Sequence, residues 1–163
     1  MRPTLLILAA AALAACDVDP AGLGAGSPVR EGRVTHVTDG DTIRIGEERV
    51  RLIGVDTPET RKPGTPVQCF GRQATAFTTR FVLGRRVRLE LDAEHRDRYG
   101  RLLAYVRRSD DGAFLNAALV DRGYARPLTI PPNVHHAARF ARLARRARAH
   151  RRGLWAPRAC SAG

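Results

Sequence analysis

Three short alternating segments, separated by glycine-containing turns, constrain the fold of this chain most strongly. Polar and apolar residues alternate over residues 33–37, 42–45 and 49–55, and turn sequences occupy residues 39–41 and 46–48 between them. Alternation with a period of two is typical of strands with one buried face, and tight turns join antiparallel neighbours. The pattern therefore predicts an antiparallel meander.

The rest of the chain adds helices to this meander. Apolar residues with helical spacing predict three helices, at residues 71–83, 115–122 and 135–152. Alternation predicts two more strands, at residues 87–91 and 102–106. The 163 residues suffice for one domain, which we expect to span residues 30–160. Five strands interrupted by helices predict an α+β fold, with a five-stranded barrel of the oligonucleotide/oligosaccharide-binding (OB) type and three helices.

The N-terminal segment has the pattern of an export signal. Residues 1–15 combine a basic start with an apolar run too short to span a bilayer, which is typical of a signal peptide. The run ends in Leu13-Ala14-Ala15 before Cys16, which resembles the lipobox of bacterial lipoproteins, whose cysteine becomes the acylated first residue. Residues 16–29 are rich in glycine and proline and predict a flexible tether.

These features predict an extracytoplasmic protein, anchored by lipid on Cys16 to the bacterial cell envelope, at its periplasmic face or at the cell surface. An ordinary cleavable signal with a chance cysteine is the alternative. The anchor would leave Cys69 and Cys160 as an even pair in an oxidising compartment, which predicts a disulfide that ties the C-terminal tail to the middle of the domain. Two free thiols are the alternative for this pair.

The charge of the chain favours polyanionic partners. The formal net charge is +12, which attracts nucleic acid or anionic lipid head groups. Lys62 is the only lysine, however, and a surplus of arginine and alanine also fits the codon usage of a GC-rich genome. Charge alone leaves both interpretations open.

Carboxylates stand near the ends of two predicted strands. Asp41 precedes one strand, and Asp56 and Glu59 lie around the end of the next, so antiparallel pairing would bring them together. Hard oxygen ligands of this kind suit Ca²⁺ or Mg²⁺, and carboxylates this close need a compensating cation. Together with Arg51 and Arg101, they are the groups that phosphoryl chemistry needs.

The spacing leaves an alternative open. On a straight strand Arg51 and Asp56 face opposite sides, because their separation is odd. Convergence requires a bend or bulge at Gly54, or an end to the strand before Asp56. Without it, the carboxylates are explained equally well as solvated turn residues.

Longer motifs extend this pattern. Residues 38–42 (TDGDT), 51–60 (RLIGVDTPET) and 97–105 (DRYGRLLAY) closely resemble motifs of the staphylococcal (thermo)nuclease family. Weaker landmarks of that family match at residues 115–123 and 153–155, and the resemblance spans residues 31–156. It implies a calcium-dependent nuclease with little sequence preference, which cuts the P–O5′ bond of DNA and RNA and leaves 3′-phosphates.

The same resemblance implies roles for individual residues. The carboxylates of Asp41 and Asp56 and the backbone carbonyl of Thr57 would bind Ca²⁺. Glu59 would orient or deprotonate the attacking water. The phosphate would be bound, and the transition state stabilised, by two arginines, Arg51 and Arg101.

Residues beside this set also match the family. Asp39 would lie near the metal, and Arg98 and Tyr99 beside the nucleotide pocket. The chain departs from the family in the loop at residues 126–133, which lacks the tyrosines that pack against the substrate base in family members. This departure puts the affinity and base preference in doubt but leaves the catalytic groups intact.

A catalytically degenerate barrel that only binds nucleic acid or a partner is the alternative function. Such a relative would be expected to lose a metal carboxylate or a phosphate arginine. Asp41, Arg51, Asp56, Glu59 and Arg101 are all present, which favours the enzyme. We expect a monomer without a protein partner.

Three C-terminal features have structural interpretations. Trp155 is expected to fill the core beside the last helix. His135 and His136 are expected to begin that helix rather than bind a metal as a pair, because adjacent residues point apart on a helix. The arginines of residues 139–152 are expected to form a solvated face that attracts polyanions.

Overall fold

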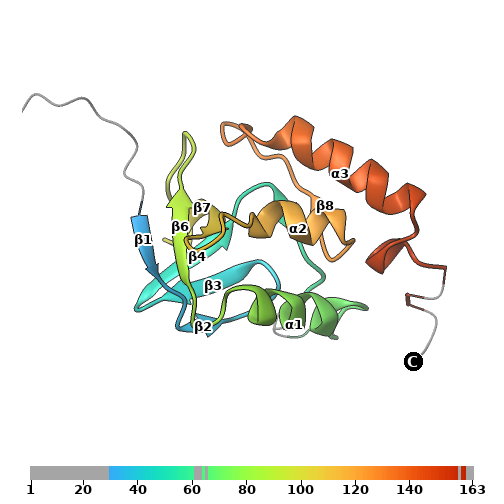
Figure 1. Ribbon diagram of the computed structural model, residues 1–163, viewed down its shortest axis with the longest axis horizontal. Helices are drawn as coiled ribbons and strands as arrows, with labels where there is room; N and C mark the ends of the chain where they lie inside the picture. The colour runs from blue at the N-terminus through green and yellow to red at the C-terminus, as the bar shows by residue number, and fades with distance from the viewer. Residues whose placement is uncertain (1–29, 61–63, 65, 158, 161–163) are drawn as a thin grey trace, which may run out of the picture.

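A mixed β-sheet and three helices make up the described part of the chain, which covers residues 30–60, 64, 66–157 and 159–160 of this computed structural model (Figure 1). The strands of the sheet span Arg30–Arg33 (β1), His36–Val37 (β2), Thr42–Ile45 (β3), Glu48–Leu52 (β4), Arg86–Glu90 (β6) and Leu102–Arg108 (β7). Their order is β1-β6-β7-β4-β3-β2, in which β4 and β7 are parallel and the other neighbours antiparallel. The predicted signal peptide, Cys16 and the tether lie outside the described residues.

The first predicted strand is shared between two neighbours. The backbone N–H of Val34 donates to Arg85 O at 2.9 Å, whereas the N–H of Thr35 donates to Arg44 O at the same distance. The segment therefore divides into β1, which pairs with β6, and β2, which pairs with β3. The predicted α+β class and OB-like fold are confirmed, but the sheet has six strands instead of five and is not closed as a barrel, because β1 and β2 remain its edges.

The predicted strand at residues 49–55 is also divided. It bends at Gly54 after β4 ends, and Val55–Asp56 (β5) pairs instead with Arg126–Pro127 (β8), in the loop after the second helix. Gly54 has a φ of +77°, and a Cβ at this position would lie 2.5 Å from the Phe140 ring. A glycine is required because both the left-handed backbone and the close ring exclude a side chain.

The three predicted helices are confirmed as Gly71–Val82 (α1), Leu115–Asp121 (α2) and Ala137–Ala149 (α3), followed by a short 3₁₀ turn at Gly153–Trp155 (η1). α2 packs against both α1 and α3 and also contacts β7, so that it links the helices to the sheet (Figure 1). Fully buried apolar side chains from both layers meet there, among them Ile43, Val50, Leu102, Leu115 and Phe140. None of the helices among the described residues is long and apolar enough to cross a membrane.

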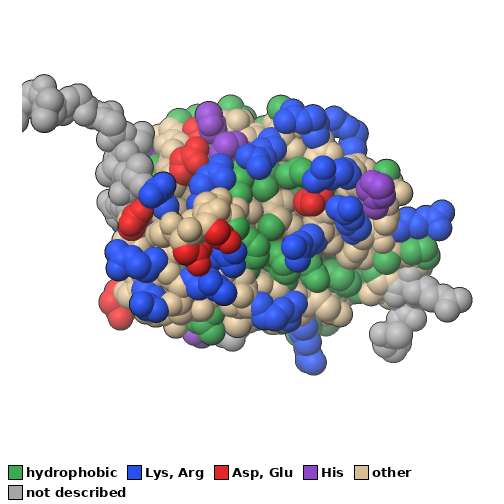
Figure 2. Space-filling model, in the orientation of Figure 1, with side chains coloured by type: hydrophobic (Ala, Val, Ile, Leu, Met, Phe, Trp, Pro, Cys, Tyr) green, Lys and Arg blue, Asp and Glu red, His purple; other side chains and the backbone are tan. Residues whose placement is uncertain are grey.

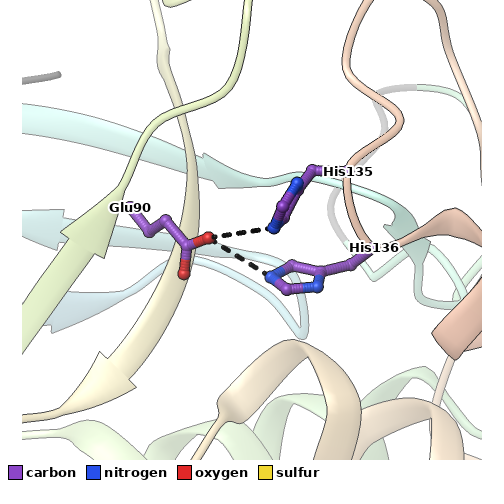
Figure 3. Close-up of side chains that lie close together, drawn as sticks. All are labelled: Glu90, His135 and His136. Atoms are coloured by element: carbon purple, nitrogen blue, oxygen red, sulfur yellow. Dashed lines mark ion pairs between the residues drawn. The ribbon is translucent and has the colours of Figure 1, made fainter.

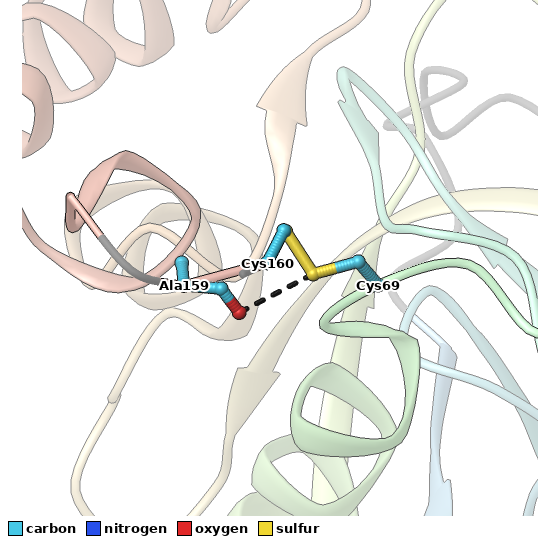
Figure 4. Close-up of a disulfide and its surroundings, with 3 residues drawn as sticks. All are labelled: Cys69, Ala159 and Cys160. Atoms are coloured by element: carbon cyan, nitrogen blue, oxygen red, sulfur yellow. Dashed lines mark hydrogen bonds between the residues drawn. A yellow bond between two sulfur atoms is a disulfide. The ribbon is translucent and has the colours of Figure 1, made fainter. Parts of the chain in front are cut away.

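The C-terminal tail differs in part from expectation. The prediction that Trp155 fills the core is wrong: the side chain is only partly buried and lies beside the guanidinium groups of Arg126 and Arg148, at 5.6 and 4.3 Å from its ring centroid. The tail then returns to the start of α1, where Cys69 and Cys160 form a disulfide with an S–S distance of 1.96 Å (Figure 4).

Candidate active site

Asp41 lies at the centre of the candidate site and is buried at the start of β3. Its Oδ2 accepts hydrogen bonds from the backbone N–H and the hydroxyl of Thr57, both at 2.8 Å. Gly40 permits this approach, since a Cβ there would lie 2.7 Å from the Thr57 hydroxyl oxygen. Asp39 Oδ1 accepts the N–H of Asp41 at 3.1 Å, and Thr78 of α1 donates to Gly40 O at 2.6 Å. The turn is therefore fixed on both sides.

Arg51 joins the two carboxylates that were expected to bind a metal. Its Nη1 lies 3.1 Å from Asp41 Oδ1, and its Nη2 lies 3.3 Å from Asp56 Oδ1. Nη1 also donates to the carbonyls of Leu52 and Val55, at 3.1 and 2.9 Å, on either side of the Gly54 bend. The bend thus brings Arg51 and Asp56 together despite their odd separation.

Glu59 is positioned through its backbone as well as its side chain. Its N–H donates to Gln68 Oε1 at 2.9 Å, and its carbonyl accepts the N–H of Gln68 at 2.8 Å. Glu59 Oε1 accepts the N–H of Thr60 at 2.9 Å. Because Gln68 precedes the disulfide-bonded Cys69, the segment that carries Glu59 is connected to the C-terminal tail.

Arg101 is oriented by a carboxylate from the preceding turn. Asp97 accepts the Nε–H of Arg101 at 2.7 Å and the backbone N–H groups of Tyr99 and Arg101 at 2.9 and 3.0 Å. These hydrogen bonds lower the pKa of Asp97, against an opposing effect of burial. The ring of Tyr99 is exposed, with guanidinium groups of Arg98 and Arg101 at 4.8 and 5.4 Å from its centroid.

All the predicted catalytic, metal-binding and substrate-binding residues line two adjoining pockets. A polar pocket of about 210 Å³ is lined by Asp39, Asp41, Thr42, Arg51, Asp56, Thr57, Pro58, Glu59 and Arg101. A larger, mostly apolar one of about 490 Å³ shares Arg51 and Arg101 with it. Arg98 and Tyr99 line the larger pocket, together with Leu128 and Ile130 from the loop that lacks tyrosines.

The carboxylates repel one another in this pocket. Burial raises the pKa of Asp39 to about 6, and the charge of Asp41 adds to the rise. Burial and then Asp41 also raise the pKa of Asp56, although Arg51 opposes the rise. Such a set of hard oxygen donors, with only Arg51 and Arg101 as basic residues lining the pocket, fits a divalent cation of the Ca²⁺ or Mg²⁺ type.

The sequence analysis missed residues that position the others. Gln68 and Asp97 hold Glu59 and Arg101, and neither occupies a position that periodicity marks as functional. Asn116 is fully buried in α2, where its side chain donates to Ile53 O at 2.8 Å and accepts the N–H of Val106 at 2.9 Å. A polar residue within an apolar helical face was the available signal for Asn116.

Known proteins are similar to this chain over the region that carries most of the site residues. A family model described as "Staphylococcal nuclease homologue" matches residues 49–157. A thermonuclease of Staphylococcus intermedius is 45% identical over 126 residues, which cover 75% of this chain and 74% of that protein. A thermonuclease of Staphylococcus hyicus is 40% identical over 127 residues, covering 76% and 74%. Endonuclease YncB of Bacillus subtilis is 36% identical over 123 residues, covering 72% and 57%.

Proposed function

This chain belongs to the staphylococcal nuclease family, and from that membership we propose that it is a calcium-dependent endonuclease of DNA and RNA. The names of its relatives support the coarser statement that it hydrolyses phosphodiester bonds of nucleic acids. Cleavage at the P–O5′ bond, with 3′-phosphates as products, is the finer part of the proposal. It rests on the motifs shared with the family.

One observation supports the proposal above all others: carboxylates and two arginines, separate in sequence, line one small pocket. Asp41, Asp56 and the backbone of Thr57 would hold the cation, with Asp39 beside them. When bound, a divalent cation there would neutralise these groups and polarise a phosphate oxygen.

The remaining residues act on water and phosphate. Glu59 would orient a water for attack on phosphorus, or take its proton. Arg51 and Arg101 would each stabilise the negative charge that builds on the phosphate oxygens, since a guanidinium can donate to two oxygens at once. Arg101 could assist the departing oxygen.

The adjoining pocket suits a nucleotide. Arg98 and Tyr99 offer a charge and an aromatic ring there, whereas Leu128 and Ile130 replace aromatic contacts with aliphatic ones. Aliphatic contact excludes water without the stacking energy of about 1–3 kcal/mol per base that an aromatic ring supplies. We therefore expect a pocket lined by these aliphatic side chains to discriminate only weakly among bases. The net charge of +12 and the basic side chains spread over the face in Figure 2 add attraction to polyanions.

The function is tested by incubating the purified protein with single-stranded DNA, with calcium and then with a chelator. We expect cleavage that requires calcium and leaves 3′-phosphates. A folded protein that binds DNA but does not cut it, whichever divalent ion is added, would instead indicate a degenerate binding module.

Membrane anchoring through lipid on Cys16, at the periplasmic face or the surface of the bacterial cell envelope, belongs to the same proposal. The Cys69–Cys160 disulfide supports an oxidising compartment. Cys16→Ser should move the protein from the membrane fraction to the soluble fraction, and continued membrane association would contradict the anchor. We also propose that the protein is a monomer, which its mass in solution tests.

A further inference from the structure

A cluster of two histidines and a glutamate lies outside both pockets (Figure 3). Glu90 ends β6, and His135 and His136 immediately precede α3. Glu90 Oε1 is 3.4 Å from His136 Nε2 and 3.8 Å from His135 Nε2. Among the described residues, this group brings three potential ligand atoms of His, Cys, Asp or Glu within 4.8 Å of one another.

Both histidine rings face the same carboxylate because they are not on the helix. The expectation that adjacent residues point apart assumed a helix from residue 135, but α3 begins at Ala137. The N–H of His135 instead donates to Asp92 Oδ2 at 3.0 Å. The rings of His135 and His136 lie with their centroids 4.5 Å apart, and Figure 3 shows both directed at Glu90.

The surrounding structure holds this arrangement before any ligand arrives. Asn133 accepts the N–H of Glu94 and donates to its carbonyl, at 2.7 and 2.8 Å, which fixes the histidine segment beside the end of β6. The His136 ring makes T-shaped contacts with the rings of Tyr105 and Phe114, at centroid distances of 4.5 and 5.0 Å. The Nε2 of His136 is buried and makes no hydrogen bond within the described part of the chain, where its polar contact is the one with Glu90.

The two carboxylate oxygens of Glu90 have different neighbours. Arg107 lies 3.6 Å from Glu90 Oε2, whereas both imidazoles approach Oε1. Burial lowers the pKa of His136, with smaller contributions in the same direction from His135, Arg107 and Arg139, against Glu90. His135 and Glu90 remain open to solvent, with side chains 64% and 37% exposed.

We propose that Glu90, His135 and His136 bind a first-row divalent metal of the Zn²⁺ class. Two imidazole nitrogens and a carboxylate oxygen form a donor set that such ions prefer, and that Ca²⁺ does not. Tetrahedral zinc with ligand distances of about 2.0–2.1 Å places its ligand atoms about 3.3 Å apart. The distances of 3.4 and 3.8 Å from Glu90 Oε1 to the two imidazole nitrogens are close to this value, and the ligand atoms of the two histidines lie within 4.8 Å of each other. Water would complete the coordination.

Bound metal would join β6 to the start of α3. The residues that follow β6 and those that precede α3 are already joined by the hydrogen bonds of Asn133 with Glu94 and of His135 with Asp92, and the metal would add to this connection. An ion that binds only the folded chain stabilises it by an amount that grows with the logarithm of the ion concentration, once that concentration exceeds the dissociation constant. The site is thus separate in ligands, place and effect from the carboxylate pocket.

Calorimetric titration of the purified, tag-free protein with Zn²⁺, in excess Ca²⁺ to occupy the carboxylate pocket, tests the proposal. We expect one equivalent to bind, and at least tenfold weaker binding in both Glu90→Gln and His135→Ala. His150→Ala is the matched control, because His150 is exposed at the far end of α3, about 20 Å away at 1.5 Å per residue. Its binding should equal that of the wild type.

A measurement without substitutions guards against variants that fold poorly. In imidazole NMR spectra of the wild type, Zn²⁺ should shift the signals of His135 and His136 and leave those of His36 and His150 in place. No saturable binding, or binding unchanged in Glu90→Gln and His135→Ala, would reduce the cluster to an ion pair and overturn the proposal.

Discussion

Arg51 and Arg101 are held in different ways, and this difference determines how each depends on its neighbours. Arg51 donates to two carbonyls and contacts Asp41 and Asp56, so its position follows from the bend of the backbone. Arg101 is held through its Nε by the carboxylate of Asp97, and its guanidinium also lies 5.4 Å from the centroid of the Tyr99 ring. The ion pair that orients Arg101 therefore depends on the side chain of Asp97, which substitution can remove.

Asp97→Asn should lower kcat/KM about tenfold, the equivalent of about 1.4 kcal/mol in the barrier, because Arg101 loses a charged acceptor. The pKa of Asp97 in the folded protein lies below its ordinary value of 3.8. The ionised carboxylate of Asp97 thus stabilises the folded protein above pH 3.8, and this contribution is lost as the pH falls through the pKa of the folded state. Urea unfolding should show that Asp97→Asn is less stable than the wild type at pH 7, with the gap closing in acid. A constant gap would contradict the role of the charge.

Glu59→Gln separates chemistry from folding at the same site. The amide retains the size of the side chain and an acceptor for the Thr60 N–H, but it cannot take a proton. We expect cleavage to fall by about 10²–10⁴-fold, the range for loss of a general base, with an unchanged melting temperature. Activity within tenfold of the wild type would remove Glu59 from the mechanism.

Asp41→Ala should abolish calcium-dependent cleavage and also destabilise the fold. Asp41 is buried, and its loss leaves the N–H and hydroxyl of Thr57 without their acceptor. An unsatisfied buried donor costs about 1–3 kcal/mol. Cleavage assays and denaturant unfolding, with Asp56→Ala as an exposed comparison, should show the stability loss for Asp41→Ala and a smaller one for Asp56→Ala.

At the scale of elements, the junction of β4 and β5 determines the geometry of the site. β4 pairs with β7 in the sheet, β5 pairs with β8 outside it, and Gly54 lies between them. Asn116 of α2 supports the same junction by its hydrogen bond to Ile53 O. A helix, a sheet and a loop thus jointly position Arg51 against Asp56.

Gly54→Ala tests this junction. The methyl group would be forced into a positive φ and against the Phe140 ring, at a combined cost of about 2–4 kcal/mol. Thermal unfolding should show this loss, and activity should fall as well because Arg51 moves relative to Asp56. Gly84→Ala is the matched control, since Gly84 has a φ of +73° with nothing near its Cβ position. Equal effects of the two substitutions would show that the Phe140 contact is unimportant.

At the scale of the whole molecule, the disulfide connects the end of the chain to the catalytic segment. Cys160 pairs with Cys69 across a sequence separation of 91, and the preceding Gln68 hydrogen-bonds the backbone of Glu59 from both sides. Opening this bridge therefore affects global stability and the position of Glu59 together.

The double substitution Cys69→Ser with Cys160→Ser should lower the free energy of unfolding by about 4.6 kcal/mol in the chain-entropy model. It should also reduce kcat more than KM, because Glu59 acts on the attacking water. Reductant should destabilise the wild type and leave the double variant unchanged, which serves as the control. Equal melting temperatures of wild type and variant would contradict a structural role for the bridge.

The sequence by itself determined the parts whose cause is local. Alternation, turn glycines and helical spacing follow from neighbouring residues, so the meander, the three helices and the motifs around Asp41, Asp56 and Tyr99 were predictable. Hydrogen bonding between distant segments was not, and the division of the first strand between β1 and β2 could not be predicted for that reason.

The tertiary structure decided where those parts meet. The chain bends at Gly54, where the Phe140 ring leaves no room for a side chain and β5 pairs with β8, and the bend brings Arg51 and Asp56 into contact despite their odd spacing. The partial exposure of Trp155 and the shared orientation of His135 and His136 likewise depend on neighbours far away in the sequence. Side-chain direction at the end of an element is set by these long-range contacts, because the regular periodicity that predicts direction no longer applies there.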